Sequence, residues 1–416
     1  DGSLQVRSVD DESILVSARF VQVTESGGLN GTALPVFTTG RLTAPGEEIF
    51  LTGLDGAAHA DLFIVSGSSG GASVRIDSLD RSGQVVESQG PLELAPWETI
   101  ELQDFAPSIA ATAIVRNEAS SGGPVAAYAM LRDEPAGDPW VTVDWSSYWG
   151  ESRATSLLVP IARHAGPSAA GQGRRRAVRR PGSESELEER TSVDLTLFNT
   201  TDDEAASLLS FHDTTGRITE RIVRLDPRET ATFADVVSLT FDRQGVIDGY
   251  IRIEPLRGLI VADARLVSLT DRGVNGSTVP LHPRGAGMRL GERRSIAAID
   301  DSRRDTIEEG IPTTWRSRFR LIETSGRSAV IRATMRVSTG RALAVATVSR
   351  DFEIGPNQIL RLGEIGQAIM GEERQIGVED LHDLLVDFYV EDGDGSVLVV
   401  AESIENATGD SIVRFD

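Results

Sequence analysis

The sequence predicts an all-β protein built as a tandem array of antiparallel β-sandwich domains. Three observations carry this prediction: short runs in which apolar and polar residues alternate, turns rich in Gly, Asp, Asn and Pro, and a pattern that recurs along the chain. The 416 residues are too many for one sandwich, and aromatic residues make up only 5% of them. With 41 Gly and 17 Pro, the composition favours many short strands over long helices.

A predicted β-hairpin is the clearest repeat. Apolar residues alternate with polar ones along its strands, and Gly, Asp or Asn stands at the reversals. The two closest copies share an Arg in the strand before the last turn, Arg19 or Arg265, and an Asn-Gly-Thr or Asn-Gly-Ser turn. The four copies lie at residues 2–37, 113–143, 249–282 and 385–415.

A second segment precedes three of these hairpins. It has a short alternating strand, a longer one, and then a turn that contains Pro, which fixes φ and ends a strand. The short strands are Asp61–Val65, Asp194–Phe198 and Arg318–Ile322. The longer strands are Ser73–Leu79, Ala206–His212 and Ala329–Val337. The turns are Leu94–Thr99, Leu225–Thr230 and Ile354–Ile359. Their prolines are about 130 residues apart, which suits one sandwich of seven or eight strands per repeat.

The repeats divide the chain into three fuller domains and one incomplete one. Residues 1–38 are predicted to be the closing hairpin of an incomplete repeat, followed by sandwiches at 39–150, 151–285 and 286–416. A lone hairpin cannot bury its apolar face. We therefore expect that the chain is a piece of a longer one, that the hairpin packs on the next domain, or that it adds to a neighbouring molecule's sheet.

Two insertions and three short helices complete the predicted organisation. Residues 165–191 carry an Arg-rich run and then a Glu-rich run, which predicts a mobile insertion, and residues 300–312 form a second, acidic insertion at the same place in the next repeat. One face of each strand is expected to be buried and the other wet, as in sheets packed face to face. The helical candidates are Val236–Phe241, Ile365–Met370 and Val378–Leu385.

The order of these motifs resembles a class of bacterial extracellular proteins built from immunoglobulin-like or fibronectin-like β-sandwich repeats. The best matches are Leu195–Asn199, the Pro turn at 225–230, Gly249–Ile253 and Thr314–Ser317. The resemblance covers nearly the whole chain. It implies surface, adhesive or structural roles, or attachment to a secreted enzyme, and it does not imply catalysis.

Charge and composition restrict the partners. The formal net charge of −22 repels nucleic acid and anionic lipid, so neither is an expected partner. No apolar run is long enough to insert in a membrane, and without Cys the chain has no disulfide, thiolate metal site or Cys nucleophile.

Sequence motifs predict no catalytic residue and no cofactor site. The five His lack metal-ligand spacing, and no nucleophile elbow or phosphate-binding loop occurs. A weak Ca²⁺ site at Asp392 and Asp394 is the single cofactor candidate, because Ca²⁺ prefers several oxygen ligands; solvated turns are the alternative. Four Asn-x-Ser/Thr sequons occur, at Asn30, Asn199, Asn275 and Asn406.

A cluster of aromatic residues follows the second hairpin, at the predicted boundary near residue 150. Its members are Trp140, Trp145, Tyr148 and Trp149. Stacked aromatic rings bind sugars or partner proteins, but they also fill junctions between domains, and the position favours the junction.

These observations predict a non-enzymatic extracellular or cell-surface protein with a structural or adhesive role, as a surface, stalk or fibre subunit. The expected partner is a second copy or another surface protein that binds through the β domains. The alternative is a glycan- or protein-binding accessory region of a larger secreted hydrolase.

Overall fold

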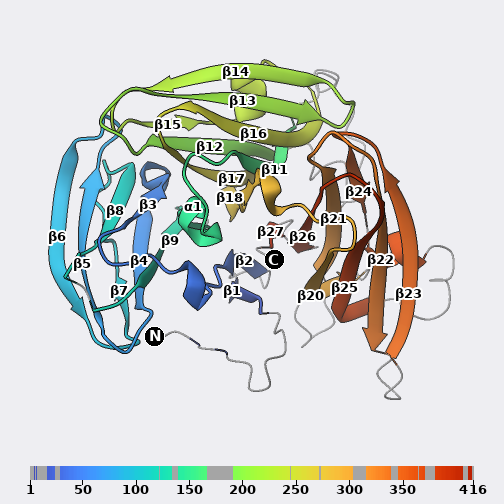
Figure 1. Ribbon diagram of the computed structural model, residues 1–416, viewed down its shortest axis with the longest axis horizontal. Helices are drawn as coiled ribbons and strands as arrows, with labels where there is room; N and C mark the ends of the chain where they lie inside the picture. The colour runs from blue at the N-terminus through green and yellow to red at the C-terminus, as the bar shows by residue number, and fades with distance from the viewer. Residues whose placement is uncertain are drawn as a thin grey trace.

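The structure is a computed structural model that describes residues 4, 6, 16–23, 29–120, 122–133, 139–165, 191–243, 245–270, 273–302, 315–338, 345–363, 365–370, 380–405 and 411–414. Almost all regular structure in them is antiparallel β-sheet, which confirms the predicted all-β class. The strands form three sandwiches and one separate hairpin (Figure 1). None of the helices among these residues is long and apolar enough to cross a membrane.

Each sandwich has eight described strands, and we letter their positions A to H in chain order. The first contains β3 (Glu48–Thr52), β4 (His59–Ser66), β5 (Ala72–Leu79), β6 (Val85–Leu94), β7 (Thr99–Leu102), β8 (Thr112–Asn117), β9 (Val125–Arg132) and β10 (Pro139–Thr142). The second contains β11 (Leu157–His164), β12 (Thr191–Asn199), β13 (Ala205–Asp213), β14 (Ile218–Leu225), β15 (Thr230–Phe233), β16 (Ile247–Arg257), β17 (Ile260–Thr270) and β18 (Gly273–Thr278). The third contains β20 (Arg293–Ser302), β21 (Trp315–Glu323), β22 (Ala329–Ser338), β23 (Val345–Ile354), β24 (Ile359–Leu362), β25 (Asp380–Gly393), β26 (Val397–Glu405) and β27 (Ser411–Val413).

All three sandwiches have the same topology. One sheet has the strand order A-F-C-D and the other H-G-B-E; we call them the AFCD and HGBE sheets. In the second sandwich the two sheets also meet where His164 of β11 pairs with Ser192 of β12. The short strand β19 (His282–Pro283) adds to β11. A shared strand order in three successive units explains why the sequence pattern recurs.

The separate hairpin, β1 (Ala18–Val23) and β2 (Leu29–Leu34), has the register of a G-H hairpin. Arg19 pairs with Ala33 in it, and Arg265 pairs with Thr278 in β17–β18. Two residues further along, each G strand pairs with the Gly of the Asn-Gly turn. The same pairing in both hairpins supports the prediction that they are equivalent parts of a repeat.

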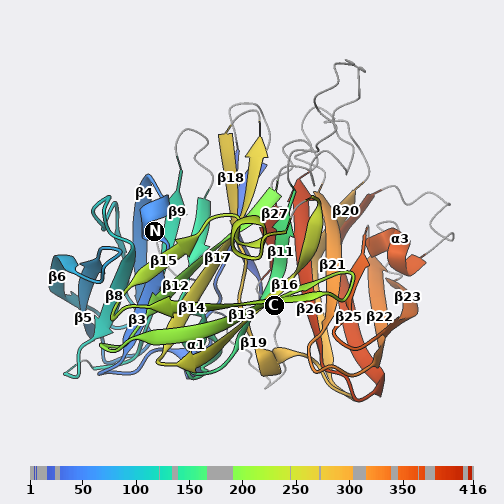
Figure 2. The same ribbon diagram turned by 90° about the horizontal axis from the view of Figure 1, so that it is seen from above.

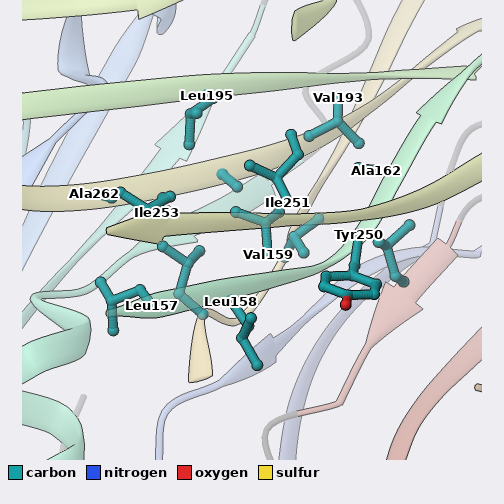
Figure 3. Packing of buried hydrophobic residues seen from close by; sticks show 14 of the residues in the cluster. Leu157, Leu158, Val159, Ala162, Val193, Leu195, Tyr250, Ile251, Ile253 and Ala262 are labelled. Carbon is teal, nitrogen blue, oxygen red and sulfur yellow. The ribbon is translucent and has the colours of Figure 1, made fainter. Parts of the chain in front are cut away.

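Alternation of apolar residues builds the core between the two sheets. In β12 the side chains of Val193, Leu195 and Leu197 are fully buried and face the core of the second sandwich. Figure 3 shows such residues packed together, with Val159 of β11 beside Ile251 of β16, its partner in register. Burial of this apolar surface is the main favourable term in folding.

The predicted Pro turns are the same type II turn in all three sandwiches. The residue after each Pro has positive φ, 61° at Trp97, 59° at Arg228 and 54° at Asn357. In the first sandwich the Glu98 carboxylate then accepts a 2.5 Å hydrogen bond from the Ala95 backbone N–H, which compensates for the strained conformation. The same bond recurs from Asp226 to Glu229 and from Gly355 to Gln358.

A buried polar side chain at the end of strand B fastens the turns around it. Asn199 donates hydrogen bonds to the carbonyl oxygens of Asp203 and Asp226, at 2.7 and 2.8 Å. At the equivalent point Glu323 accepts hydrogen bonds from five backbone N–H groups, those of Ser325, Gly326, Arg327, Asn357 and Ser396. Asn199 is fully buried, so this predicted sequon does not offer its side chain to solvent.

The helical predictions had mixed outcomes. Residues Ile365–Met370 form α3 as predicted, and residues Val236–Thr240 form a π-helical turn, η4. The helix predicted at Val378–Leu385 is wrong, because strand β25 begins at Asp380 and pairs with β20 and β22. Pairing on both sides of a central strand overrides local helix propensity there.

The sandwiches pack side by side in an arc and do not form an extended stalk (Figure 1). The AFCD sheet of each sandwich faces the HGBE sheet of the next. Strand β18 of the second sandwich contacts β10 of the first and β27 of the third, and it lies near the middle of the molecule in the view from above (Figure 2). The expectation that the outer face of each strand is wet is therefore wrong at two sheet–sheet interfaces. The eight-strand units span 48–142, 157–278 and 293–413.

Candidate functional site: the interfaces between sandwiches

The interface between the first and second sandwiches has an apolar centre. Phe50, Leu79 and Ile114 project from the AFCD sheet of the first sandwich and contact Phe198 and Val261 of the second. The Phe50 and Phe198 rings are 5.5 Å apart, and all five side chains are at most 2% exposed. Such burial is typical of a permanent contact, because it removes apolar surface from water as a domain core does.

The connection between these sandwiches is a short aromatic helix, α1 (Trp145–Trp149). Asp144 caps its first turn, with a carboxylate oxygen 3.2 Å from the Ser147 backbone N. Trp145 is fully buried, and its indole N–H donates a 3.0 Å hydrogen bond to Asp263 of the second sandwich. The helix is thus bound to the sheet that it leads into.

The other predicted aromatic residues lie at the same junction. The Tyr148 ring packs edge-on against Trp145 and Trp149, and the Trp149 indole N–H donates to the Leu281 carbonyl oxygen. Trp140 of β10 lies beneath the Arg265 guanidinium, 3.5 Å from its ring centroid. The structure therefore brings all four aromatic residues to the contact between the first two sandwiches.

Arg265 and Asp263 join this junction electrostatically from one strand, β17. The Arg265 guanidinium is 2.6 Å from the Asp133 carboxylate of the first sandwich. Burial raises the pKa of Asp263 to about 7, although the Trp145 N–H partly opposes the rise. Near neutral pH this carboxyl group is poised between its neutral and charged forms.

The interface between the second and third sandwiches has an ionic centre. Arg163 of β11 binds the Glu402 carboxylate with both terminal nitrogens, at 3.2 and 2.9 Å. Arg320 of β21 donates a 2.8 Å hydrogen bond to Asp248 of β16, which also contacts Arg361. The first four of these side chains are 1–6% exposed. Two charges from each sandwich are thus neutralised by partners from the other.

The buried cations determine the ionisation of Glu402. Burial alone would raise the pKa of this group, but Arg163, Arg320 and Arg318 lower it to about 2. Because the folded-state pKa is depressed, the stabilisation is present above the ordinary Glu range and is lost as the pH falls toward 2. The ion pair therefore holds the sandwiches together at any pH near neutral.

The H strands of all four repeat units meet at the centre of the arc. Going once around this centre, β2 contacts β10, β10 contacts β18, β18 contacts β27, and β27 contacts β2. The Thr278 hydroxyl bonds both the N–H and the C=O of Val141, at 2.6 and 2.7 Å. Ala33, Trp315 and Ile412 form a small apolar cluster between the hairpin and the third sandwich. The four strands form a closed hub.

The calcium candidates do not form a cluster. The Asp392 carboxylate accepts a hydrogen bond from the Gly393 N–H, and Asp394 is 81% exposed and 3.9 Å from Arg327. In the described part of the chain, no group of three or more His, Asp or Glu side chains is placed to hold a metal ion. The Ca²⁺ site stays a prediction.

The His residues serve packing and local pairing. His212 stacks on Tyr250, and burial lowers its pKa to about 4. His282 is buried beside Trp149, and burial lowers its pKa to about 3. Both rings are neutral near pH 7.

The two predicted insertions lie largely outside the described residues. The backbone N–H of Ala165 donates a 2.9 Å hydrogen bond to the Thr191 carbonyl oxygen, which closes the base of the first insertion.

Sequence reasoning missed the charged residues of the interfaces. Asp263 and Arg320 occupy outward positions of strands in which apolar and polar residues alternate. The alternation therefore predicts that these side chains face solvent. A signal for buried outer faces does exist, because Val397–Ala401 is a continuous apolar run in which every side chain is buried. Such runs are typical of strands covered on both faces.

Comparisons with known proteins add little to this geometry. No protein-family model matches the chain, and no curated protein matches it. A crystal structure of Streptomyces avermitilis alpha-L-rhamnosidase complexed with L-rhamnose is similar at 9% identity over 91% of this chain, with a TM-score of 0.15. This chain spans 44% of that enzyme. A tetra-tandem repeat in the extending region of a large adhesion protein is 11% identical over 97% of this chain and 82% of that chain, with a TM-score of 0.11. Neither TM-score supports a shared fold.

Titration of Asp263 makes the stability of the protein depend on pH. Because the folded-state pKa of Asp263 is raised, the contribution of this group to the free energy of unfolding is complete below about pH 4 and is lost as the pH rises through 7. Asp263→Asn keeps the oxygen that accepts from Trp145 but cannot ionise. Relative to this variant, the wild-type free energy of unfolding should fall by about 1.4 kcal/mol per pH unit across that window, measured by urea titration. Parallel pH profiles would contradict the assignment.

Loss of one member of the buried ion pair should destabilise the chain strongly. Arg163→Met leaves the Glu402 charge buried without its bidentate partner and should cost about 3–5 kcal/mol of unfolding free energy. Replacing both Arg163 and Glu402 by Met should restore much of that loss. Arg75→Met, at an exposed pair, is the matched control and should cost less than about 1 kcal/mol. Equal losses in the control and in Arg163→Met would show that the pair is not important.

Proposed function

We propose that the protein is a non-catalytic structural or adhesive component on the outside of the cell, which presents a rigid arc of β-sandwiches to its partners. The observation that carries this proposal is the way in which the sandwiches are joined. Each connection is short, and the sheets on either side are fixed by buried contacts such as Trp145 with Asp263 and Arg163 with Glu402. Rigidity of this kind suits a platform or surface subunit better than a flexible spacer between domains.

The side-by-side packing of the sandwiches changes the expected shape from an extended stalk or fibre to an arc. Identical topology in successive units, without a described cluster of metal-binding side chains, fits a protein whose repeats build shape. The arc buries one broad face of the first sandwich, both of the second and one of the third, so new partners have the remaining outer faces and the strand edges for contact. Self-association or binding of another surface protein through these surfaces is the expected mode of action.

The runner-up function is an accessory region of a larger secreted hydrolase that binds a glycan or a protein. The Phe63 and Tyr128 rings favour it, because they stack 5.0 Å apart on the outer face of the first sandwich and are only partly buried. Stacked aromatic rings on a sheet face are a common sugar-binding element. Both functions place the chain outside the cell.

Localisation in the producing organism tests the proposal most directly. Immunogold labelling should place the protein outside the cytoplasmic membrane, and an immunoblot should show a gene product that contains sandwich repeats and no hydrolase-sized addition. A product with a catalytic domain fused to these repeats would favour the accessory role. Label confined to the cytoplasm would refute both functions.

A further inference from the structure

Strand β14 is an open sheet edge on the convex side of the arc, away from the central hub (Figure 1). It is the D strand of the second sandwich, and among the described strands it pairs with β13 alone. All eight of its residues, from Ile218 to Leu225, pair with β13 without a shift in register. The strand is therefore regular, and its outer edge presents a row of backbone N–H and C=O groups that can pair with another strand.

The equivalent edges of the other two sandwiches are less suited to such pairing. Strand β6 of the first contains Pro91, which has no N–H to donate, and its pairing with β5 shifts in register at two points. Strand β23 of the third exposes polar side chains such as Ser349 and Asp351. Strand β14 has neither Pro nor a bulge, and Ile218 and Ile222 on it are 48% and 55% exposed. A regular backbone edge beside exposed Ile side chains indicates a contact surface.

The charged side chains of β14 are placed symmetrically about Ile222. Glu220 and Arg224 lie two residues before and two residues after it, on the same face of the strand, and both are exposed. In the described part of the chain neither of these two side chains belongs to an ion pair. Opposite charges at equal distances from one apolar residue fit a partner strand of the same sequence that runs in the opposite direction.

We propose that two copies of this chain associate through β14, whose edges pair antiparallel about a twofold axis at Ile222. Ile222 of one copy then lies opposite Ile222 of the second, and Glu220 of each copy lies opposite Arg224 of the other. The two AFCD sheets join into one sheet of strand order A-F-C-D-D-C-F-A, and the arcs stand back to back. This inference rests on the proposed mode of action, in which copies associate through free surfaces and strand edges.

The other symmetric registers bring like charges together. A twofold axis keeps the same face of both sheets on the same side, so each register is centred on one residue of β14. Centring on Arg221 places two guanidinium groups opposite each other, and centring on Val223 places Glu220 opposite Asp226. Like charges directly opposite each other destabilise a strand pair. The charge pattern therefore selects the register centred on Ile222.

The size of the contact sets the expected affinity. Pairing through one eight-residue edge is a small contact beside the roughly 1,200–2,000 Å² of a standard protein interface. The dimer should therefore be reversible, with a Kd on the order of 10 µM.

Sedimentation equilibrium of the 416-residue chain across that concentration range tests the association. The chain should pass reversibly from monomer to dimer as its concentration rises. Ile222→Lys places two ammonium groups opposite each other and should raise the Kd at least ~10-fold. Ile218→Lys is the matched control, because Ile218 is similarly exposed but faces Asp226 of the second copy, so the Kd should stay equal or fall. Both variants should keep the wild-type unfolding midpoint, since both side chains are exposed.

A charge swap tests the register itself. Glu220→Arg alone and Arg224→Glu alone should each raise the Kd ~10-fold, because each brings like charges together, and the double variant E220R/R224E should restore the wild-type value. Hydrogen exchange gives a second readout, since the outward amides of β14 should become protected as the concentration rises while those of β6 stay unchanged.

Three results would overturn the β14 pairing: a chain that is monomeric at every concentration, a dimer that Ile218→Lys and Ile222→Lys weaken equally, or a double variant that fails to recover. These results are separate from the localisation test. A monomeric chain found outside the cell would refute the pairing and leave the proposed location standing, whereas a β14 dimer found in the cytoplasm would do the reverse.

Discussion

Burial of both faces of the HGBE sheet is the constraint on which the rest of the structure depends. The inner face of such a sheet belongs to the core of its own sandwich, and in the second and third sandwiches its outer face is covered by the sandwich before it. Outward residues such as Phe198 and Arg320 are therefore as inaccessible as core residues. Once both faces are covered, the orientation of each sandwich relative to its neighbour is fixed, and the arc and the central hub follow from repeating that relation.

Two different chemistries meet this constraint. The first interface uses apolar contact around Phe50 and Phe198, which is favourable but tolerant of small displacements. The second uses the paired charges of Arg163 with Glu402 and Arg320 with Asp248. The free-energy cost of desolvating these charges is offset only when the two sandwiches are aligned so that each charge meets its partner. Each ionic pair has one residue in the second sandwich and one in the third. A wrong partner or register would therefore leave a buried charge without a counter-charge. The ionic interface thereby contributes specificity as well as stability.

Much of the fold could be predicted because strands and turns depend on local signals. Alternation located β5, β13 and β22, and the Pro turns fell where the backbone needs a fixed φ followed by a left-handed residue. The aromatic cluster was placed at the junction because it follows the end of a repeat. Two kinds of feature escaped prediction. Strand β25, which pairs with a strand on each side, stands where a helix was expected. The interface charges were expected to face solvent, because alternation cannot show what covers the outer face of a sheet.

If the interfaces fix the arrangement, the three sandwiches should lose their structure together. Differential scanning calorimetry of the 416-residue chain near neutral pH measures this directly. The account predicts one transition whose calorimetric enthalpy equals its van 't Hoff enthalpy, as for a single cooperative unit. Two or three separate transitions, each of the size of one sandwich, would show that the interfaces do not couple the domains and would contradict the account.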